Sequence, residues 1–312
     1  MNNIRRSGFS LVEMLIALTL GVIVVSAAIK YFMTEFRVLT ANDVREVVAR
    51  NGRYIGVALR RDLQRAGVGI ETTTTFGTVD TWPGTYGDTL VVLYVPYIPQ
   101  ASPPHGIVPP EGVTENPLPP NSTCGLQCIE VTKAAEPALD LGAGDLGRLQ
   151  VLAGRRLVLI ESANLTSDTS VELKFTNAAT LLGQAAGMTD LSLDRFGTYV
   201  QKLQPAIYYL DEDRLMRAVR LNLDGSPVGE VLAYGVERFD VKVVFFDGDV
   251  FEQVNALDTD DSNDYDDVSA LKITVTLKAD RVHPMVNGGE PFKRTFVWTI
   301  APRNLRYEKN RL

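Results

Sequence analysis

One carboxylate stands inside the longest apolar stretch of the sequence. The run from Phe9 to Ile29 contains a single charged residue, Glu13. As a helix rising about 1.5 Å per residue, this run would be roughly 30 Å long, which is the thickness of a bilayer core. A carboxylate inside a membrane span costs about 2.5–3.5 kcal/mol on insertion scales, so such a residue is expected to have a function and a partner. The chemistry offered here is charge pairing in an apolar environment.

The residues before this run are basic. Residues 1–8 contain Arg5 and Arg6 and no acidic residue, so they are expected to stay in the cytoplasm and direct the rest of the chain outward. Three interpretations remain open. The run is a secretory signal peptide cut near Ser26-Ala27-Ala28, a simple membrane anchor, or a span in which Glu13 has a role. The first two have no use for the carboxylate.

A pair of cysteines offers redox chemistry. Cys124 and Cys128 are the only cysteines, separated by three residues. If this part of the chain lies outside the cytoplasm, a disulfide between them is expected, and it would stabilise little because the loop it closes is short. A metal pair is not favoured, because the nearest histidine, His105, lies far before Cys124 in the sequence and the only other is His283.

An acidic segment offers oxygen ligands. Residues 257–267 read LDTDDSNDYDD, and closely spaced carboxylates are what Ca²⁺ requires. The segment departs from an EF-hand, because Asn263 and Ser269 stand where that loop has Gly and Glu. A solvated acidic hairpin and a calcium-binding loop both stay open. In the second case, calcium should raise the thermal stability. The segment's aspartates are Asp258, Asp260, Asp261, Asp264, Asp266 and Asp267, of which all but the last are the predicted ligands.

Composition excludes several classes of protein. The 312 residues are 45% hydrophobic and 22% charged, which excludes a collagen-like chain, a disordered chain and a polytopic membrane protein. The net charge of −7 argues against a nucleic-acid surface. No phosphate-loop, Gly-x-Ser-x-Gly or His-Glu-x-x-His pattern occurs, and both histidines are expected to be exposed loop residues. We therefore expect no enzyme, while an anchored enzyme and a DNA-capturing protein remain as alternatives.

The elements that position these residues begin with a long helix. Residues 30–66 are compatible with a helix, and Gly67 and Gly69 provide the stop signal. Continued from Phe9, this helix would be too long for a compact domain, so its first half must be buried in membrane or among other subunits. Gly21, Gly52 and Gly56 are the places where this helix is expected to bend or to melt locally. The second half has an apolar stripe that should pack on the protein's own sheet, formed by Val44, Val48, Ile55, Leu59, Leu63 and Ala66.

The rest of the chain is predicted to be mainly antiparallel sheet. Residues 96–120 hold nine of the sixteen prolines and are predicted to form an extended surface loop. Because the strands have no long helices between them, the fold class is α+β rather than doubly wound α/β. The predicted strands are 89–95, 148–152, 156–161, 171–175, 198–210, 214–221, 229–234, 237–246, 269–278 and 293–301.

The N-terminal residues resemble a known processing motif. Ser7-Gly8-Phe9-Ser10-Leu11-Val12-Glu13 is similar to the prepilin motif of type IV pilins and type II secretion pseudopilins. The resemblance implies that a prepilin peptidase cuts after Gly8 and that the new first residue, Phe9, is N-methylated. It also implies that Glu13 pairs with the terminal amine of a neighbouring subunit during assembly.

Later segments resemble minor pilins of the PilW type. Asp62, Leu63, Ala66 and Gly67 match the sequence that ends the long helix in that group. The segments around Tyr208-Tyr209-Leu210, Leu215-Met216-Arg217, 234–241, 269–278 and Arg303-Asn304-Leu305 look like its body. Residues 96–195 match no part of this pattern.

The resemblance implies four parts and a role. The parts are a leader peptide at 1–8, a membrane or pilus-core half helix at 9–29, an amphipathic half helix at 30–67, and a β-rich head at 68–312. The expected function is that of a minor pilin that helps initiate a type IV pilus and forms part of its tip, supporting adhesion, twitching motility or DNA uptake.

The resemblance also implies partners and a location. Expected partners are other minor pilins, the major pilin, the prepilin peptidase and a tip adhesin, without direct nucleic-acid binding. Before assembly the chain would cross the inner membrane once with a periplasmic head, and afterwards it would lie in the extracellular pilus. The alternative role is that of a J-type pseudopilin of type II secretion.

Overall fold

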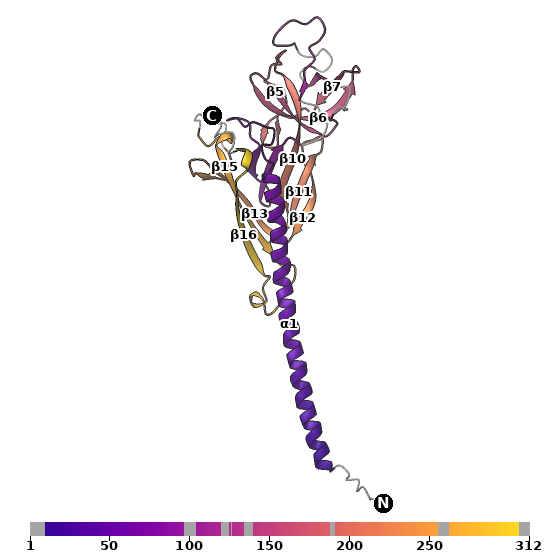
Figure 1. Cartoon of the computed structure of the whole chain (residues 1–312), viewed down its shortest axis with the longest axis vertical. Helices are drawn as coiled ribbons and strands as arrows, with labels where there is room; N and C mark the ends of the chain where they lie inside the picture. The colour runs from indigo at the N-terminus through magenta and orange to yellow at the C-terminus, as the bar shows by residue number, and fades with distance from the viewer. Residues whose placement is uncertain are drawn as a thin grey trace, which may run out of the picture. The chain divides into compact units, whose positions relative to one another are not determined.

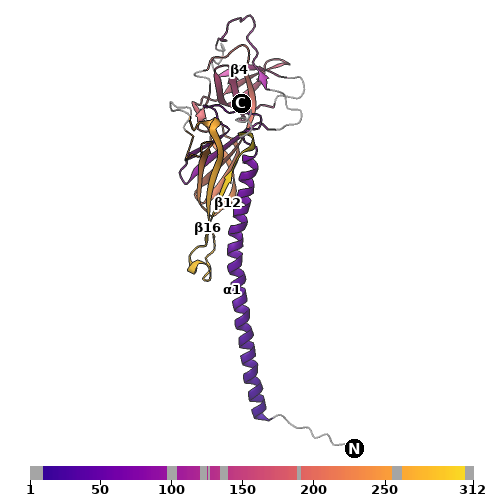
Figure 2. The same cartoon turned by 60° about the vertical axis from the view of Figure 1, so that its left-hand side comes forward.

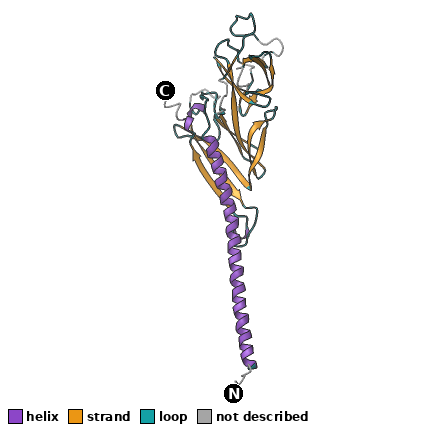
Figure 3. Cartoon of the chain, turned by 45° about the vertical axis from the view of Figure 1, so that its right-hand side comes forward, coloured by secondary structure: helices purple, strands orange, loops and turns teal. Residues whose placement is uncertain are grey.

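A computed structural model describes residues 10–96, 104–119, 125, 127–133, 140–187, 191–254 and 262–305. The chain divides into two compact units. The first comprises residues 1–50 and 278–294, and the second comprises residues 51–277 and 295–312. Figure 3 shows that the second unit is built largely from strands. The expected α+β class with mostly antiparallel sheets is confirmed.

A single helix, α1, runs from Leu11 to Leu63 without a break (Figure 1). At about 1.5 Å per residue its 53 residues span roughly 80 Å. Turns follow it, and both Gly67 and Gly69 have positive φ angles, which confirms the predicted stop signal. All members of the predicted apolar stripe are buried, namely Val44, Val48, Ile55, Leu59, Leu63 and Ala66.

Two glycines of α1 have a different role from the expected one. The helix is continuous through Gly52 and Gly56, so it does not melt locally at either glycine. A Cβ atom on Gly52 would lie 2.3 Å from Phe296 Cζ, and one on Gly56 would lie 2.9 Å from Trp298 Cε2. The two aromatic rings stack with centroids 5.7 Å apart. These glycines therefore admit a pair of rings against the helix backbone, a requirement that sequence spacing does not reveal.

The largest sheet is organised by one long strand, β10 (Tyr199–Asp211). Its first part pairs with β5 and β3, and its second part lies between β2 and β11. In Figure 1, β10 lies between the strands β5, β6 and β7 on one side and β11 and β12 on the other. The remaining strands of this sheet are β1 (Val79–Pro83), β2 (Asp88–Tyr94), β3 (His105–Gly106), β4 (Cys128–Thr132), β5 (Leu146–Val151), β6 (Gly154–Leu165), β7 (Ser170–Phe175), β11 (Arg214–Leu221) and β12 (Pro227–Tyr234).

A second sheet has the order β14-β13-β15-β16. Its strands are β13 (Val236–Phe245), β14 (Val250–Phe251), β15 (Val268–Lys278) and β16 (Lys293–Ile300), and Figure 2 shows β16 in yellow. A small hairpin of β8 (Thr180–Leu181) and β9 (Gln184–Ala185) and two short 3₁₀ turns, Tyr265–Asp267 and Asn287–Gly289, complete the described elements.

Every strand predicted from the sequence is present, within two residues at most ends. Alternation reveals them because one face of each strand is buried: in β15, Leu271, Ile273, Val275 and Leu277 are all 0–1% exposed. The strands missed were β1, β3, β4, β8, β9 and β14. They are two to five residues long, which is too short for a periodic pattern to be distinguished from a loop.

Candidate functional site

The helix begins with a reciprocal pair of hydrogen bonds. The backbone N–H of Ser10 donates to Glu13 Oε2 at 2.9 Å, and the N–H of Val12 donates to Ser10 Oγ at 3.4 Å. This is a capping box, which satisfies amides that the first helical turn leaves unpaired. The Ser-x-x-Glu spacing is a local signal for this cap, which Glu13 forms in addition to its predicted intersubunit role. Gly8 and Phe9 lie outside the described residues, so cleavage and methylation stay predictions.

The first part of α1 exposes an apolar surface all round. Every residue from 10 to 39 is exposed within the chain. By length and composition this helix can cross a membrane. Apolar side chains exposed on all sides of a helix require an apolar environment from outside the chain, either lipid or other helices. Glu13 is the one acidic residue in the first turn of this surface.

The last turn of α1 is joined to the sheet through a buried carboxylate. Asp62 is 0% exposed, and its Oδ2 accepts hydrogen bonds from Tyr208 Oη at 2.6 Å and Arg217 Nε at 2.7 Å. Arg61 Nε lies 3.3 Å from the other carboxylate oxygen. An acidic residue near a helix C-terminus opposes the helix dipole, so Asp62 depends on these partners.

The surrounding charges keep Asp62 ionised. Burial acts to raise the pKa of its carboxyl, but the hydrogen bonds from Arg217 and Tyr208 and the positive charges of Arg217 and Arg61 outweigh burial, and the pKa lies below its ordinary value. Burial and the adjacent carboxylate raise the pKa of Tyr208, so its hydroxyl remains a donor. The result is a buried, fully partnered ionic junction between α1, β10 and β11.

The residues that follow α1 are held by hydrogen bonds close to the end of the helix. Asn304 Nδ2 donates to the carbonyl oxygen of Ala66 at 2.9 Å, and the N–H of Gly67 donates to the carbonyl oxygen of Leu93 at 3.1 Å. Gly67 has φ +73°, a conformation that favours glycine. Three segments that are far apart in the sequence therefore meet at the end of α1: residues 62–67, the β10–β11 region and Asn304.

The expectation of an exposed loop histidine is wrong for His105. This residue lies in β3, inside the proline-rich segment, and is 4% exposed. Its Nδ1 lies 3.0 Å from the carbonyl oxygen of Thr132 and its Nε2 lies 2.8 Å from Asp140 Oδ1. Each ring nitrogen therefore has an oxygen partner within hydrogen-bond distance. The hydrogen bond from His105 lowers the pKa of Asp140. Because this segment is rich in proline, its sequence does not predict the two-residue strand β3, which pairs with β10.

His283 is half-buried rather than exposed. Its Nε2 lies 3.0 Å from Thr40 Oγ1, and its Nδ1 accepts the N–H of Met285 at 3.2 Å. Because Nδ1 accepts, the proton of a neutral ring resides on Nε2, which donates to Thr40. Both histidines thus have both ring nitrogens engaged, and neither presents a free nitrogen for acid–base chemistry.

The predicted calcium segment is described only at its end. Asp258, Asp260 and Asp261 lie outside the described residues, so the calcium site stays a prediction. Asp264 is 4% exposed, whereas Asp266 is exposed. The two ligands that the structure describes therefore differ in their access to solvent.

Tyr265 fixes the end of this segment to β1. Its hydroxyl donates to Asp80 Oδ2 at 2.9 Å, and Asp80 Oδ1 accepts the N–H of Thr81 at 2.8 Å. Burial raises the pKa of Asp80 to about 6, against the opposing effect of these two hydrogen bonds. A Cβ atom on Gly77 would lie 2.0 Å from Tyr265 Cδ1, so a glycine is required under the ring.

Another carboxylate cluster appears that the sequence did not indicate. Oxygen atoms of Asp88, Asp240 and Glu252 lie within 4.8 Å of one another. The N–H of Val241 donates to Asp88 Oδ2 at 2.7 Å, and Lys242 is paired with Glu252. Burial raises the pKa of Asp88, and the two neighbouring carboxylates raise it further. Lys242 thus offsets part of the negative charge of the cluster.

The structure describes one of the two cysteines of the predicted disulfide. Cys128 is the first residue of β4 and is 1% exposed. Cys124 lies outside the described residues, so the pairing of the two cysteines stays a prediction.

Comparison with known proteins identifies the start of the chain. Residues 3–29 match the family model of the prokaryotic N-terminal methylation motif. The type IV-like pilin TTHA1219 from Thermus thermophilus has a similar solved structure, with a TM-score of 0.38 and 11% identity over 82% of this chain and 96% of that chain. No curated protein sequence matches the chain.

Proposed function

We propose that this chain is a minor pilin of the PilW type that is made as a prepilin. The observation that carries this proposal is the coincidence of two features at the N-terminus. Residues 3–29 match the methylation motif, and the helix that follows exposes an apolar surface with one carboxylate in its first turn. A soluble domain would bury such a surface, whereas a pilin helix is covered first by lipid and then by other pilins.

Processing precedes assembly in this proposal. The chain crosses the inner membrane once, with residues 1–8 in the cytoplasm and the head in the periplasm. A prepilin peptidase cuts after Gly8 and methylates Phe9. The helix then leaves the membrane and packs among the helices of the major pilin and the other minor pilins, and the head becomes part of an extracellular filament.

Glu13 is the assembly residue. Within the chain its carboxylate accepts only a backbone N–H, that of Ser10, among the contacts of the described residues. A neighbouring subunit's terminal amine would add the opposite charge that an ionised carboxylate needs in an apolar bundle. The pairing therefore sets the position of one helix along the next.

The proposed role requires only a few copies of the chain, located near the tip of the filament. The head, residues 68–312, is large for a repeated subunit and suits the start of assembly. There it would support adhesion, twitching motility or DNA uptake together with a tip adhesin. The net charge of −7 argues against direct contact with nucleic acid. A J-type pseudopilin of type II secretion would use the same features, and the composition of the filament distinguishes the two.

Substitution of Glu13 tests this proposal. We expect Glu13→Ala to be inserted in the membrane and cleaved normally but to abolish or strongly reduce filaments, counted by electron microscopy. Glu35→Ala is the matched control, because Glu35 is an exposed acidic residue of the same helix. Normal piliation with Glu13→Ala would contradict the assembly role.

A further inference from the structure

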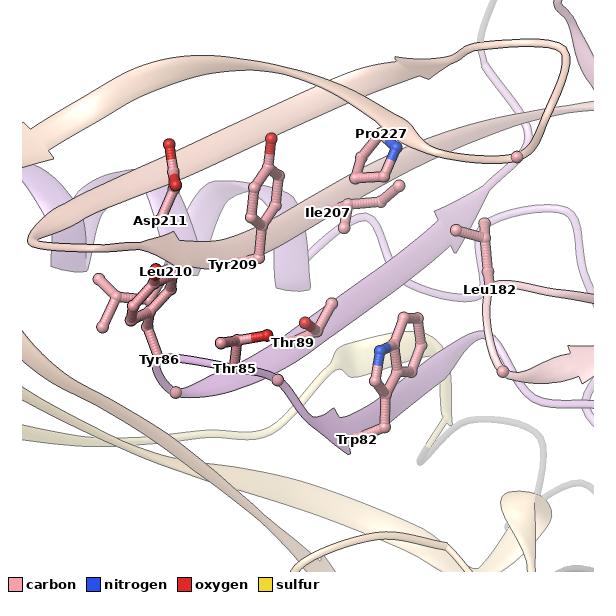
Figure 4. A pocket seen from close by; sticks show the side chains of 14 residues that line it. Trp82, Thr85, Tyr86, Thr89, Leu182, Ile207, Tyr209, Leu210, Asp211 and Pro227 are labelled. Atoms are coloured by element: carbon pink, nitrogen blue, oxygen red, sulfur yellow. The ribbon is translucent and has the colours of Figure 1, made fainter.

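A pocket of about 530 Å³ lies over one face of the large sheet, where β1, β2 and β10 are neighbouring strands. Figure 4 shows Trp82, Thr89 and Tyr209 rising from the same side of these neighbouring strands. On β10, Ile207, Tyr209 and Asp211 alternate along the strand and so share one face. Beside them in the same sheet are Trp82 of β1 and Thr89 of β2, and Thr85 and Tyr86 lie in the turn between those two strands. All of these residues belong to the second compact unit.

The aromatic walls of this pocket are held in place by glycines. A Cβ atom on Gly183 would lie 3.1 Å from Trp82 Cε3, so the indole lies directly against this glycine. A Cβ atom on Gly229 would lie 2.5 Å from Tyr209 Oη, so the phenol ring also fits only against a glycine. Rings fixed in this way present preformed flat faces, and a ligand that stacks on them need not pay the entropy of ordering them.

Polar groups stand between these faces. The indole N–H of Trp82 and the hydroxyls of Thr85 and Thr89 line the pocket and have no hydrogen-bond partner in the described part of the chain. An indole N–H donates, and a hydroxyl both donates and accepts. Flat apolar faces interleaved with neutral donors and acceptors are complementary to a ligand that alternates C–H surfaces with hydroxyls.

The charge of the pocket selects against ions. Asp211 is the one acidic residue among those that line it, and Arg214 Nη2 lies 2.7 Å from Asp211 Oδ2. The carboxylate is thus already neutralised by an adjacent guanidinium. A cationic ligand would compete with Arg214, and an anionic ligand would meet Asp211, so an uncharged ligand is favoured.

We propose that this pocket binds a neutral saccharide. A sugar ring would stack on Trp82, with Tyr86 as a second aromatic contact at the rim. Its hydroxyls would hydrogen-bond to the indole N–H of Trp82, to Thr85 and Thr89, and to the carboxylate of Asp211. This binding is independent of the pilin proposal, since it is measured on the purified chain, whereas filament assembly is measured in cells.

Fluorescence titration of the full chain tests the proposal. The chain is purified in a zwitterionic detergent without a sugar headgroup and carries Trp298→Phe, which leaves Trp82 as the only tryptophan. The probes are lactose, maltotriose and N,N′-diacetylchitobiose, with choline and inorganic phosphate as charged comparisons. We expect at least one of the three sugars to change Trp82 fluorescence saturably, with a millimolar or lower Kd, and saturation-transfer NMR on the unsubstituted chain to detect the same sugar.

Two tyrosine variants complete the test. Tyr86 is 53% exposed at the rim, so Tyr86→Ala should leave the fold intact and weaken sugar binding by about 2- to 10-fold. Tyr234→Ala is the matched control, because Tyr234 is 65% exposed on β12 and does not line the pocket. The proposal is overturned if none of the three sugars binds in either assay, if Tyr86→Ala binds as tightly as the control, or if choline or phosphate binds in place of the sugars.

Discussion

Arg217 Nε donates a hydrogen bond of 2.7 Å to Asp62 Oδ2, and this carboxylate has no exposed surface. The bond joins the last turn of α1 to β11, across 155 positions of sequence. Tyr208 on β10 donates to the same oxygen. The end of the long helix is therefore fixed by charge as well as by apolar packing, so the junction makes the loss of either charged partner costly.

Removal of the arginine should destabilise the fold strongly. Arg217→Ala leaves Asp62 buried without its main positive partner, and such a change costs about 3–5 kcal/mol. Chemical denaturation of the full chain in detergent measures the loss. Adding Asp62→Asn should recover part of it, because the uncompensated charge is then absent. A loss below about 1 kcal/mol for Arg217→Ala would show that the junction contributes little.

The pH dependence of stability should reveal Asp80. Its pKa is about 6 in the folded chain against an ordinary value of 3.8, so the folded state binds a proton more readily than the unfolded state between these values. The contribution of Asp80 to stability should therefore fall as the pH rises from 4 to 6, by at most about 3 kcal/mol. Asp80→Asn lacks this contribution, so its stability relative to the wild type should rise over the same interval.

Denaturation curves at several pH values measure that difference. Asp213→Asn is the control, since Asp213 is an exposed carboxylate of the turn between β10 and β11. Parallel pH profiles for wild type and Asp80→Asn would refute the assignment.

Filling the glycine under the aromatic pair should also destabilise the chain. Gly52→Ala would place a Cβ atom 2.3 Å from Phe296 Cζ. Overpacking of this kind costs about 1–3 kcal/mol, which exceeds the gain of about 1 kcal/mol in helix propensity. Thermal unfolding provides the measurement, and Phe296→Leu added to Gly52→Ala should restore part of the loss. Gly21→Ala is the comparison, because nothing lies within 4 Å of its added Cβ. Equal melting temperatures for the two alanine variants would contradict this packing role.

Local pattern predicted most of the fold, because the features that it detects are local. The stripe from Val44 to Ala66 follows the period of a helix, and the alternation in β15 follows the period of a strand. The stop at Gly67 depends on one residue's own backbone preference. Each of these signals is contained within a few consecutive positions.

What the sequence did not predict depends on residues far apart in the chain. Asp62 and Arg217 lie far apart in the sequence, and no local pattern shows that they pair. The packing role of Gly52 is not visible locally, because its partner, Phe296, lies on β16. The burial of His105 is not visible locally, because its partner Asp140 lies beyond the proline-rich segment. The capping role of Glu13 is the exception, since the Ser10–Glu13 spacing shows it directly.

The N-terminus of the mature chain tests the prepilin proposal most directly. The full chain is expressed in a host with a prepilin peptidase, and its N-terminal peptide is identified by mass spectrometry. We predict a chain that begins with N-methylated Phe9, because residues 3–29 match the methylation motif. A mature chain that begins at Ile29 would indicate a signal peptide, and an uncut chain that begins at Met1 would indicate a plain anchor. Either result would contradict the proposal.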